Sequence, residues 1–392
     1  LLRIANNTIT NQTTGNGVDV RNNGSTGAPV LMRLEDNTIS GNVGRGVNVD
    51  IAGTMRMQLV APTNQITSNG NAGLEVTARD TTAINVLIGD PNEPDVTANL
   101  YDANTNAGVG INLFDNSFGS LTVVNSTFSN TVDGADPATF FNGDGVGIAA
   151  RDDSTFIGQV TGSQFLTNQG AGIFGSATGD NLTVFSEILF FDIGGPNVSD
   201  GNLFDGNARG VHMVRTSNGR IGNQRPVNIQ NNVIRNNFLD GIFLSSAQSF
   251  SFDFYTIQDN LIEFNSEQGV TGNPIGNGGI HLDAQADAQL RADILRNQIT
   301  DNFLDGILVT DDSNFPSDQR GTGGTWQNNL IARNGGNGIN LLGAVDELFI
   351  GSETDVALGN LIENNVFDGV NNISAGTWSR CYSRRRRRCS RS

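Results

Sequence analysis

The sequence predicts an all-β solenoid, a parallel β-helix of about twelve three-sided coils. Three observations predict it: a short word with an apolar centre recurs every 27 to 39 residues, Asn flanks that centre at fixed offsets, and alternating apolar and polar residues follow. The word reads DNTISGN at 36–42, DNLIEFN at 259–265 and GNLIENN at 359–365. Because one repeat cannot bury its own apolar face, successive repeats must stack.

The apolar centres of the words are the anchors of the predicted coils. They are Ile9, Ile39, Ile66, Leu100, Phe128, Phe165, Phe204, Ile234, Ile262, Ile299, Ile331 and Ile362. Asn lies two residues before nine of these twelve anchors and three residues after nine of them. Since Asn favours turns and disfavours strands, we expect these amides at the corners of the coils, where they can hydrogen-bond along the solenoid axis.

A second block follows each word, a Gly and then an aliphatic residue that begins a period-two strand. Gly suits a tight corner, and the alternation is typical of a half-buried strand. One inward ladder is predicted, in which a charge would be severely destabilising. Its expected members are Val18, Val47, Leu74, Ile111, Ile148, Ile173, Val211, Ile242, Ile280, Ile307, Ile339 and Val370.

Two other solenoids disagree with the repeat. A hexapeptide β-helix needs a rigid short period, and a leucine-rich repeat needs Leu-dominated units of about 20–29 residues. The pattern Asn-x-Ile-x-x-Asn followed by Gly-(Val/Ile) resembles the repeat of the pectate-lyase-like superfamily, over residues 1–376. This resemblance implies a right-handed parallel β-helix. It implies no single activity, because the superfamily includes polysaccharide lyases, hydrolases, tailspikes and adhesins.

Composition narrows the function classes. The chain contains no Lys, and its Arg-rich tail, residues 377–392, differs sharply from the body and is expected to be disordered. Without the last thirteen residues the chain has 16 Arg against 40 acidic residues, a formal charge of −24. Such a body should repel nucleic acid. No apolar stretch reaches the length of a membrane span. We expect an extracellular or cell-surface location.

Candidate catalytic and binding residues gather on one predicted strand position. His212 and His281 both follow a corner Gly by two residues, and Phe243 holds the same place in the coil between them. We expect an exposed His–Phe–His row, which suits stacking on a sugar ring and acid–base chemistry. Arg209, Arg215 and Arg220 are expected nearby. The candidate catalytic residues are therefore His212, Arg215 and His281, and the candidate substrate-binding residues are Phe243, Arg209 and Arg220.

Carboxylates give the candidate metal site. Asp152-Asp153 and Asp311-Asp312 each follow a predicted strand near the same corner, and oxygen ligands of this kind bind Ca²⁺. Neither pair has a recognisable ligand spacing, so a solvated acidic corner with Asx-type turns is the favoured interpretation. No other cofactor is indicated. Hydrolases of the resembled superfamily carry Asn-Thr-Asp, Asp-Asp, Gly-His-Gly and Arg-Ile-Lys motifs, of which only the Asp-Asp pairs occur here.

Three functions remain open at this point. The favoured one is a secreted or cell-surface scaffold that binds carbohydrate or another surface partner, without a complete catalytic set. The alternative is a polysaccharide-active enzyme, above all a Ca²⁺-assisted lyase. The third is a structural, fibre-like element that self-associates end to end or laterally.

Overall fold

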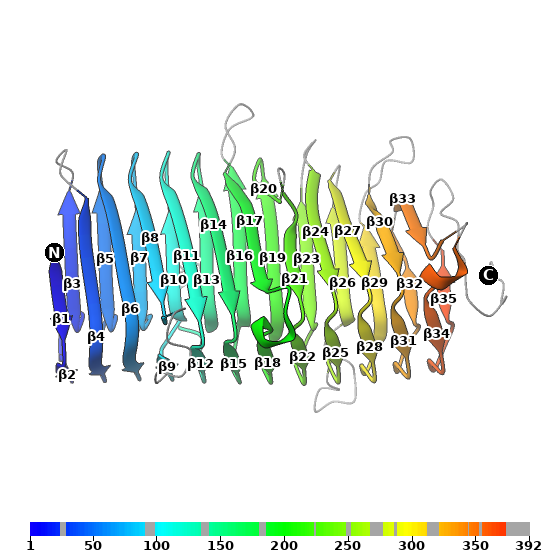
Figure 1. Ribbon diagram of the computed structural model, residues 1–392, viewed down its shortest axis with the longest axis horizontal. Helices are drawn as coiled ribbons and strands as arrows, with labels where there is room; N and C mark the ends of the chain where they lie inside the picture. Colours follow the sequence, from blue (N-terminus) through cyan, green and yellow to red (C-terminus); the bar gives the residue numbers. More distant parts are fainter. Residues whose placement is uncertain are drawn as a thin grey trace.

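The computed structural model describes residues 1–23, 29–90, 99–134, 141–179, 186–222, 225–247, 252–266, 277–285, 288–311, 321–343, 345–352 and 355–373. These residues form a parallel β-helix whose strands stack along one long axis, from the N-terminal end to the C-terminal end (Figure 1). The predicted fold class is therefore confirmed.

Sheet B is a twelve-stranded sheet that runs the length of the solenoid. Its strands pair in parallel in chain order, so each strand lies between those of the preceding and following repeats. The strands of sheet B are β3 (Val18–Asn23), β5 (Val47–Ala52), β7 (Leu74–Ala78), β10 (Ala107–Leu113), β13 (Asp144–Arg151), β16 (Ala171–Gly179), β19 (Arg209–Ser217), β23 (Ile242–Ala247), β26 (Gly278–Gln285), β29 (Asp305–Asp311), β32 (Ile339–Leu341) and β35 (Val370–Asn372).

Sheet A has 23 strands and supplies the other two sides of each coil, a long arm and a short arm. The long-arm strands are β1 (Leu2–Ala5), β4 (Val30–Ser40), β6 (Arg56–Thr67), β8 (Ala83–Ile88), β11 (Phe118–Val124), β14 (Thr155–Thr161), β17 (Glu187–Gly194), β20 (Arg220–Ile221), β21 (Val227–Gln230), β24 (Phe252–Gln258), β27 (Gln289–Leu295), β30 (Thr322–Gln327) and β33 (Val345–Ile350). The short-arm strands are β2 (Thr8–Thr10), β9 (Leu100–Asp102), β12 (Thr127–Ser129), β15 (Gln164–Leu166), β18 (Leu203–Asp205), β22 (Val233–Arg235), β25 (Leu261–Glu263), β28 (Gln298–Thr300), β31 (Leu330–Ala332) and β34 (Leu361–Glu363). β4 and β6 are long enough to run through both arms.

The anchors form one continuous column inside the solenoid. The register places Ile39 beside Ile66, and further along it joins Phe204 to Ile234 and Ile331 to Ile362. One anchor was predicted wrongly, because Tyr101 and not Leu100 pairs with Phe128. Four aromatic anchors, Tyr101, Phe128, Phe165 and Phe204, stack with ring centroids 4.8–5.1 Å apart. Rings fit here because the strand spacing of about 4.8 Å lies within the range of about 4.5–7 Å that the centroids of paired aromatic rings prefer.

The inward ladder of sheet B differs from the prediction in two coils. In these coils Val109 and Val146 occupy the predicted row. Ile111 and Ile148 lie two residues later, in the next inward row, where Ile111 pairs with Val76 and Ile148 pairs with Gly175. Each of these two strands contains a Gly-x-Gly sequence, so the sequence alone does not show which Gly is the corner, and the ladder was predicted two residues too late. The remaining ten positions of the predicted ladder are correct.

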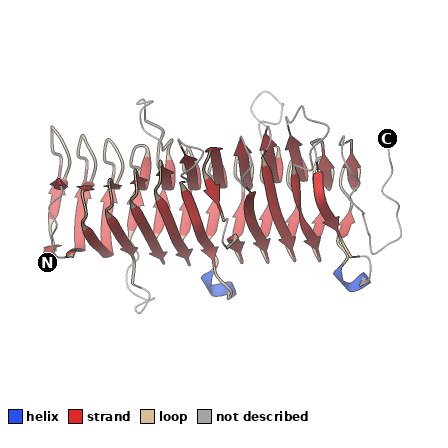
Figure 2. Ribbon diagram, turned by 90° about the horizontal axis from the view of Figure 1, so that it is seen from above, coloured by secondary structure: helices blue, strands red, loops and turns tan. Residues whose placement is uncertain are grey.

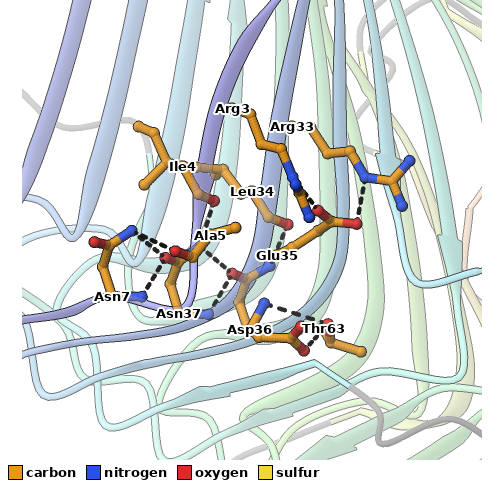
Figure 3. A network of polar contacts seen from close by, with 11 residues as sticks. Arg3, Ile4, Ala5, Asn7, Arg33, Leu34, Glu35, Asp36, Asn37 and Thr63 are labelled. Carbon is orange, nitrogen blue, oxygen red and sulfur yellow. Dashed lines mark hydrogen bonds and ion pairs between the residues drawn. The ribbon is translucent and has the colours of Figure 1, made fainter.

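Two rows of amides hydrogen-bond along the axis at the corners that flank the short arm. Asn37 Nδ2 donates to Asn64 Oδ1 over 3.0 Å and to the carbonyl of Ile4, in the preceding coil, over 2.8 Å (Figure 3). One coil earlier, Asn7 Nδ2 donates to Asn37 Oδ1 over 3.2 Å and to the carbonyl of Ala5 in its own coil. In the second row, Asn265 Nδ2 donates to Asn302 Oδ1 over 3.0 Å. Each buried amide thus satisfies a corner peptide, which apolar residues could not do.

Short arginine–carboxylate bridges join neighbouring coils on the outside. Figure 3 shows Arg3 and Arg33, from adjacent strands, meeting Glu35. Two short 3₁₀ turns, η1 (Val198–Asp200) and η2 (Val356–Leu358), project beside the stacked strands (Figure 2). Among the described residues no helix has the length and apolarity needed to cross a membrane. The Arg-rich tail, residues 377–392, lies outside the described residues.

Candidate functional site

The outward side of sheet B carries the row of rings that the sequence indicates. Register pairs Phe174 with His212, His212 with Phe243, and Phe243 with His281. Successive ring centroids lie 5.2, 5.0 and 4.7 Å apart. We call these four residues the aromatic row. Phe243 has a histidine ring on either side and the Arg209 guanidinium 4.7 Å from its centroid, so the row offers mainly ring edges to a ligand.

His281 is not exposed, contrary to the prediction, because only 6% of its surface is accessible. Its Nε2 lies 2.8 Å from Thr310 Oγ1, and its Nδ1 lies 3.0 Å from Asn277 Nδ2. Thr310 donates its hydroxyl proton to Asp283, so Thr310 accepts from His281 Nε2–H. Nδ1 then accepts from the Asn277 amide. Both nitrogens of a neutral imidazole are thereby occupied.

His212 is half-buried beneath its neighbours. Its Nε2 is buried and has no hydrogen-bond partner among the described residues. Burial, followed by the nearby Arg209 charge, lowers the pKa of His212 to about 3, while Asp240 opposes the shift. The ring is therefore neutral at physiological pH and is a poor general acid there.

An Asp recurs directly before the corner Gly and accepts backbone N–H groups of the next coil on this face. The sequence analysis did not single it out. Asp240 Oδ1 accepts the backbone N–H groups of Asn277 and Gly278, and its Oδ2 meets Arg209 Nε at 3.4 Å. Asp144 does the same for Ala171 over 2.7 Å. The Asp-Gly pair at 144–145, 240–241, 305–306 and 368–369 was the available signal. Burial raises the pKa of Asp144 to about 7, against the backbone hydrogen bonds.

The arginines do not form one cluster. Arg215, predicted beside His212, points into the solenoid, where its side chain is fully buried and its Nε lies 2.6 Å from Asp253 Oδ2. The two residues differ because Arg215 lies three positions after His212 on β19, and side chains alternate between the faces of a strand. Arg220 pairs with Glu187 on the long arm, at 3.3 Å. Of the candidates, only Arg209 accompanies the aromatic row.

The predicted calcium residues are far apart. Asp152 follows β13, whereas Asp311 ends β29, five strands further along sheet B. The Asp311 side chain and Asp312 lie outside the described residues. Asp152 instead joins a corner column with Asp80 and Asp115, in which each carboxylate accepts the backbone N–H of the coil before it. All three adopt positive φ, and Asp153 follows Asp152 in the turn. Within the described ranges no three His, Cys, Asp or Glu residues are grouped to hold a metal ion.

A second outward row, on the long arm of sheet A, was not singled out from the sequence. We call it the polar strip; every member is exposed or half-buried. Its seven residues are Thr122, Gln159, Asp192, Asn228, Thr256, Asp293 and Thr325. At about 4.8 Å per strand the strip is about 29 Å long. Its signal in the sequence was the polar half of each alternating long-arm strand, which reads only as solvent exposure until the register is known.

The strip combines hydrogen-bonding groups with apolar flanks. Asn228 Nδ2 donates to Asp192 Oδ1 over 2.6 Å, and Asp293 accepts the Thr325 backbone N–H over 2.8 Å. One pleat away on the same face lie Ile157 and Phe190, which are register partners, and Phe254. These three side chains are half-buried. The arrangement offers hydroxyl, amide and carboxylate groups beside aromatic surface.

Comparison with known proteins agrees with this architecture. The family model described as periplasmic copper-binding protein (NosD) matches residues 186–381. A search of the curated proteins found no match, and a search of the solved structures also found none. The match covers half of the chain, including three of the four residues of the aromatic row and five of the seven residues of the polar strip. With its right-handed parallel β-helix, the chain belongs to the NosD family.

Proposed function

We propose that the protein is a rigid, non-catalytic scaffold of the cell envelope that binds an extended carbohydrate along the polar strip. A periplasmic family fits a location in the envelope. The observation that carries the proposal is the strip itself: seven successive coils each present one polar side chain at the same position, with Phe190 and Phe254 in the adjacent row. An extended glycan likewise repeats hydroxyl groups and apolar ring faces at regular intervals.

The backbone beneath the strip is preorganised. Each of the seven strands that carry the strip is paired on both sides, so the side chains keep their spacing without a ligand. A rigid site loses little conformational entropy on binding, which favours affinity. A scaffold of stacked coils therefore suits recognition of a long, repetitive ligand.

The negative charge of the strip favours a neutral glycan over an acidic one. It contains two carboxylates, Asp192 and Asp293, and the neighbouring Arg225 is already bridged to Asp192 at 3.5 Å. The whole chain has a formal charge of −17. A uronic-acid polymer would meet net repulsion, so the proposed ligand is a neutral polysaccharide.

The lyase alternative gains no support from the geometry. A lyase needs a group that is free to take a proton from the sugar. His281 uses both ring nitrogens, the lowered pKa of His212 makes its ring a weak base, and Arg215 is enclosed with Asp253. The copper of the family description has no role in the proposed carbohydrate binding.

The test is binding of the purified protein to immobilised neutral polysaccharides (mannan, chitin and β-glucan) and to pectate and alginate. We expect retention on at least one neutral polymer, weak retention on the acidic ones, and no release of reducing or unsaturated ends. The variants Asn228→Ala and Thr256→Ala should weaken retention together. Thr178→Ala, a half-buried outward threonine of sheet B, is the matched control and should bind as the wild type does.

Retention that both strip variants leave unchanged would place the carbohydrate elsewhere on the surface. Failure to bind any polymer in the panel would remove the proposal, and product release would indicate an enzyme instead.

A further inference from the structure

The description of the NosD family names copper, which makes the environment of each potential copper donor in this chain informative. Sulfur and imidazole donors suit copper best. The chain has two His, four Met and two Cys. Both His and all four Met lie among the described residues, whereas Cys381 and Cys389 lie outside them. Six of the eight donors therefore have a defined environment.

The four thioethers belong to the hydrophobic core. Met32, Met55, Met57 and Met213 have at most 4% of their surface exposed. Met213 lies directly beneath Gly175, where its sulfur takes up space that a side chain at residue 175 would need. Met55 Sδ lies 3.9 Å from Asn22 Nδ2, which is a donor and not a metal ligand in this orientation. These sulfurs fill gaps between coils, the usual role of Met in a core.

The two imidazoles lie on either side of the Phe243 ring and differ in their hydrogen bonding. Phe243 lies between them, so their strands are about 10 Å apart and one ion cannot contact both. His281 has Thr310 and Asn277 on its two nitrogens. Neither nitrogen of His212 has a hydrogen-bond partner among the described residues; its Nε2 is buried, and the Arg209 guanidinium lies nearby. The same positive charge that keeps a proton off this ring opposes a copper ion.

We infer that the β-helix of this NosD-family chain holds no copper with its own side chains and folds independently of metal. The donors that copper prefers have become packing and hydrogen-bonding elements: thioethers inside the coils, and imidazoles in the aromatic row. The family relationship of this chain therefore rests on its solenoid, not on a copper site in that solenoid.

The test is competition for copper between the full chain and a chromogenic chelator, with Cu(I) under reducing conditions and with Cu(II). Two proteins are compared, the wild type and the double variant Cys381→Ser/Cys389→Ser. We expect the double variant to take less than a tenth of an equivalent of either ion. Its melting temperature should be the same in a strong chelator as with added copper.

Copper uptake by the wild type that the double variant loses would support the inference, because it would assign the metal to the two cysteines. Stoichiometric uptake by the double variant would overturn it. In that case His281→Ala, His212→Phe and Met55→Leu would show which donor holds the ion. None of these measurements depends on carbohydrate binding, so each proposal can fail separately.

Discussion

The two outward faces of the same coils differ in what they leave available. On sheet B, the rings of the aromatic row contact one another in edge-on, tilted and stacked pairs, and His281, Asp240 and Asp283 each form a hydrogen bond with the next coil. On the long arm of sheet A, the polar strip keeps its side chains exposed or half-buried along seven strands. We refer to these as the sealed face and the open face.

The difference shows that one repeat can serve stability on one side and recognition on another. Both faces have the same strand spacing and the same alternation. The sealed face gains cohesion because each outward side chain contacts the next coil, in the way that the interior rows do. On the open face the contacts between coils are hydrogen bonds between polar side chains, such as that of Asn228 with Asp192, and this is the face that we propose for an external ligand.

The largest effect is expected directly beneath the sealed face. Arg215→Ala should lower the free energy of unfolding by about 3–5 kcal/mol, because it leaves the fully buried Asp253 carboxylate without its guanidinium partner. Burial raises the pKa of Asp253 in spite of Arg215, so loss of the arginine should also make unfolding depend more strongly on pH. Chemical denaturation measures both effects. The control is Arg235→Ala, which removes a half-exposed bridge to Asp205 and should cost less than about 1 kcal/mol.

An equal loss of unfolding free energy in both arginine variants would contradict this, because it would mean that the buried pair and an exposed coil-to-coil bridge stabilise the solenoid to the same extent.

The next effect is a pH dependence at the corner of the sealed face. The folded pKa of Asp144 is raised to about 7 from an ordinary value of 3.8, so the folded protein binds a proton that the unfolded chain has lost. This contribution to stability is fully present below about pH 4 and is lost as the pH rises to about 7. The change amounts to about 4 kcal/mol at most. Asp144→Asn should remove this slope, measured as the unfolding free energy at pH 4, 6 and 8.

Asp36→Asn, at an exposed carboxylate, is the control for the change in net charge. If Asp144→Asn and Asp36→Asn show the same dependence on pH, Asp144 is ionised in the folded protein and the account of this corner is wrong.

A smaller effect separates stacking from hydrogen bonding in the aromatic row. His281→Phe should retain the contact with Phe243 but leave Thr310 and Asn277 without their shared partner, at a cost of about 1–3 kcal/mol. His281→Ala also loses the ring and should cost more. The difference between the two variants, measured by thermal unfolding, gives the contribution of the ring stack. If His281→Phe is as stable as the wild type, the hydrogen bonds of this histidine contribute nothing.

The smallest effect on stability is expected on the open face. Thr256→Ala and Gln159→Ala should change the free energy of unfolding by about 0.5 kcal/mol or less, because neither side chain is buried. The same substitutions should nevertheless weaken binding to a neutral polysaccharide. A large loss of stability in either variant would show that the open face is sealed as well, and that it serves the fold.

The interior could be predicted from the sequence because it repeats. The amides beside Ile39, Ile234 and Ile362 recur at fixed offsets, and stacking follows from that recurrence alone. The two errors in the ladder arose where Gly-x-Gly offers two candidates for the corner Gly. The error at Leu100 was avoidable, because Asn99 and Asn104 flank Tyr101 at the two expected offsets. These errors moved residues by one or two positions without changing the fold.

The faces could not be predicted in the same way, since they depend on contacts between unlike residues of different coils. The position of Arg215 in its repeat does not show that Asp253, from the next coil, lies inside the solenoid and forms an ion pair with it. Likewise His281 appears exposed until Thr310 and Asn277 are placed beside it. The polar strip is a row only after the register of seven strands is known. Outward positions vary from coil to coil, so they leave no recurring signal.

The most direct test of the account is side-chain oxidation by hydroxyl radicals, with and without a bound neutral oligosaccharide, followed residue by residue. We expect the ligand to slow oxidation of Phe190 and Phe254, beside the polar strip, and to leave the oxidation of Phe174 and Phe243, in the aromatic row, unchanged. Protection of Phe174 and Phe243 with no change at Phe190 and Phe254 would contradict it.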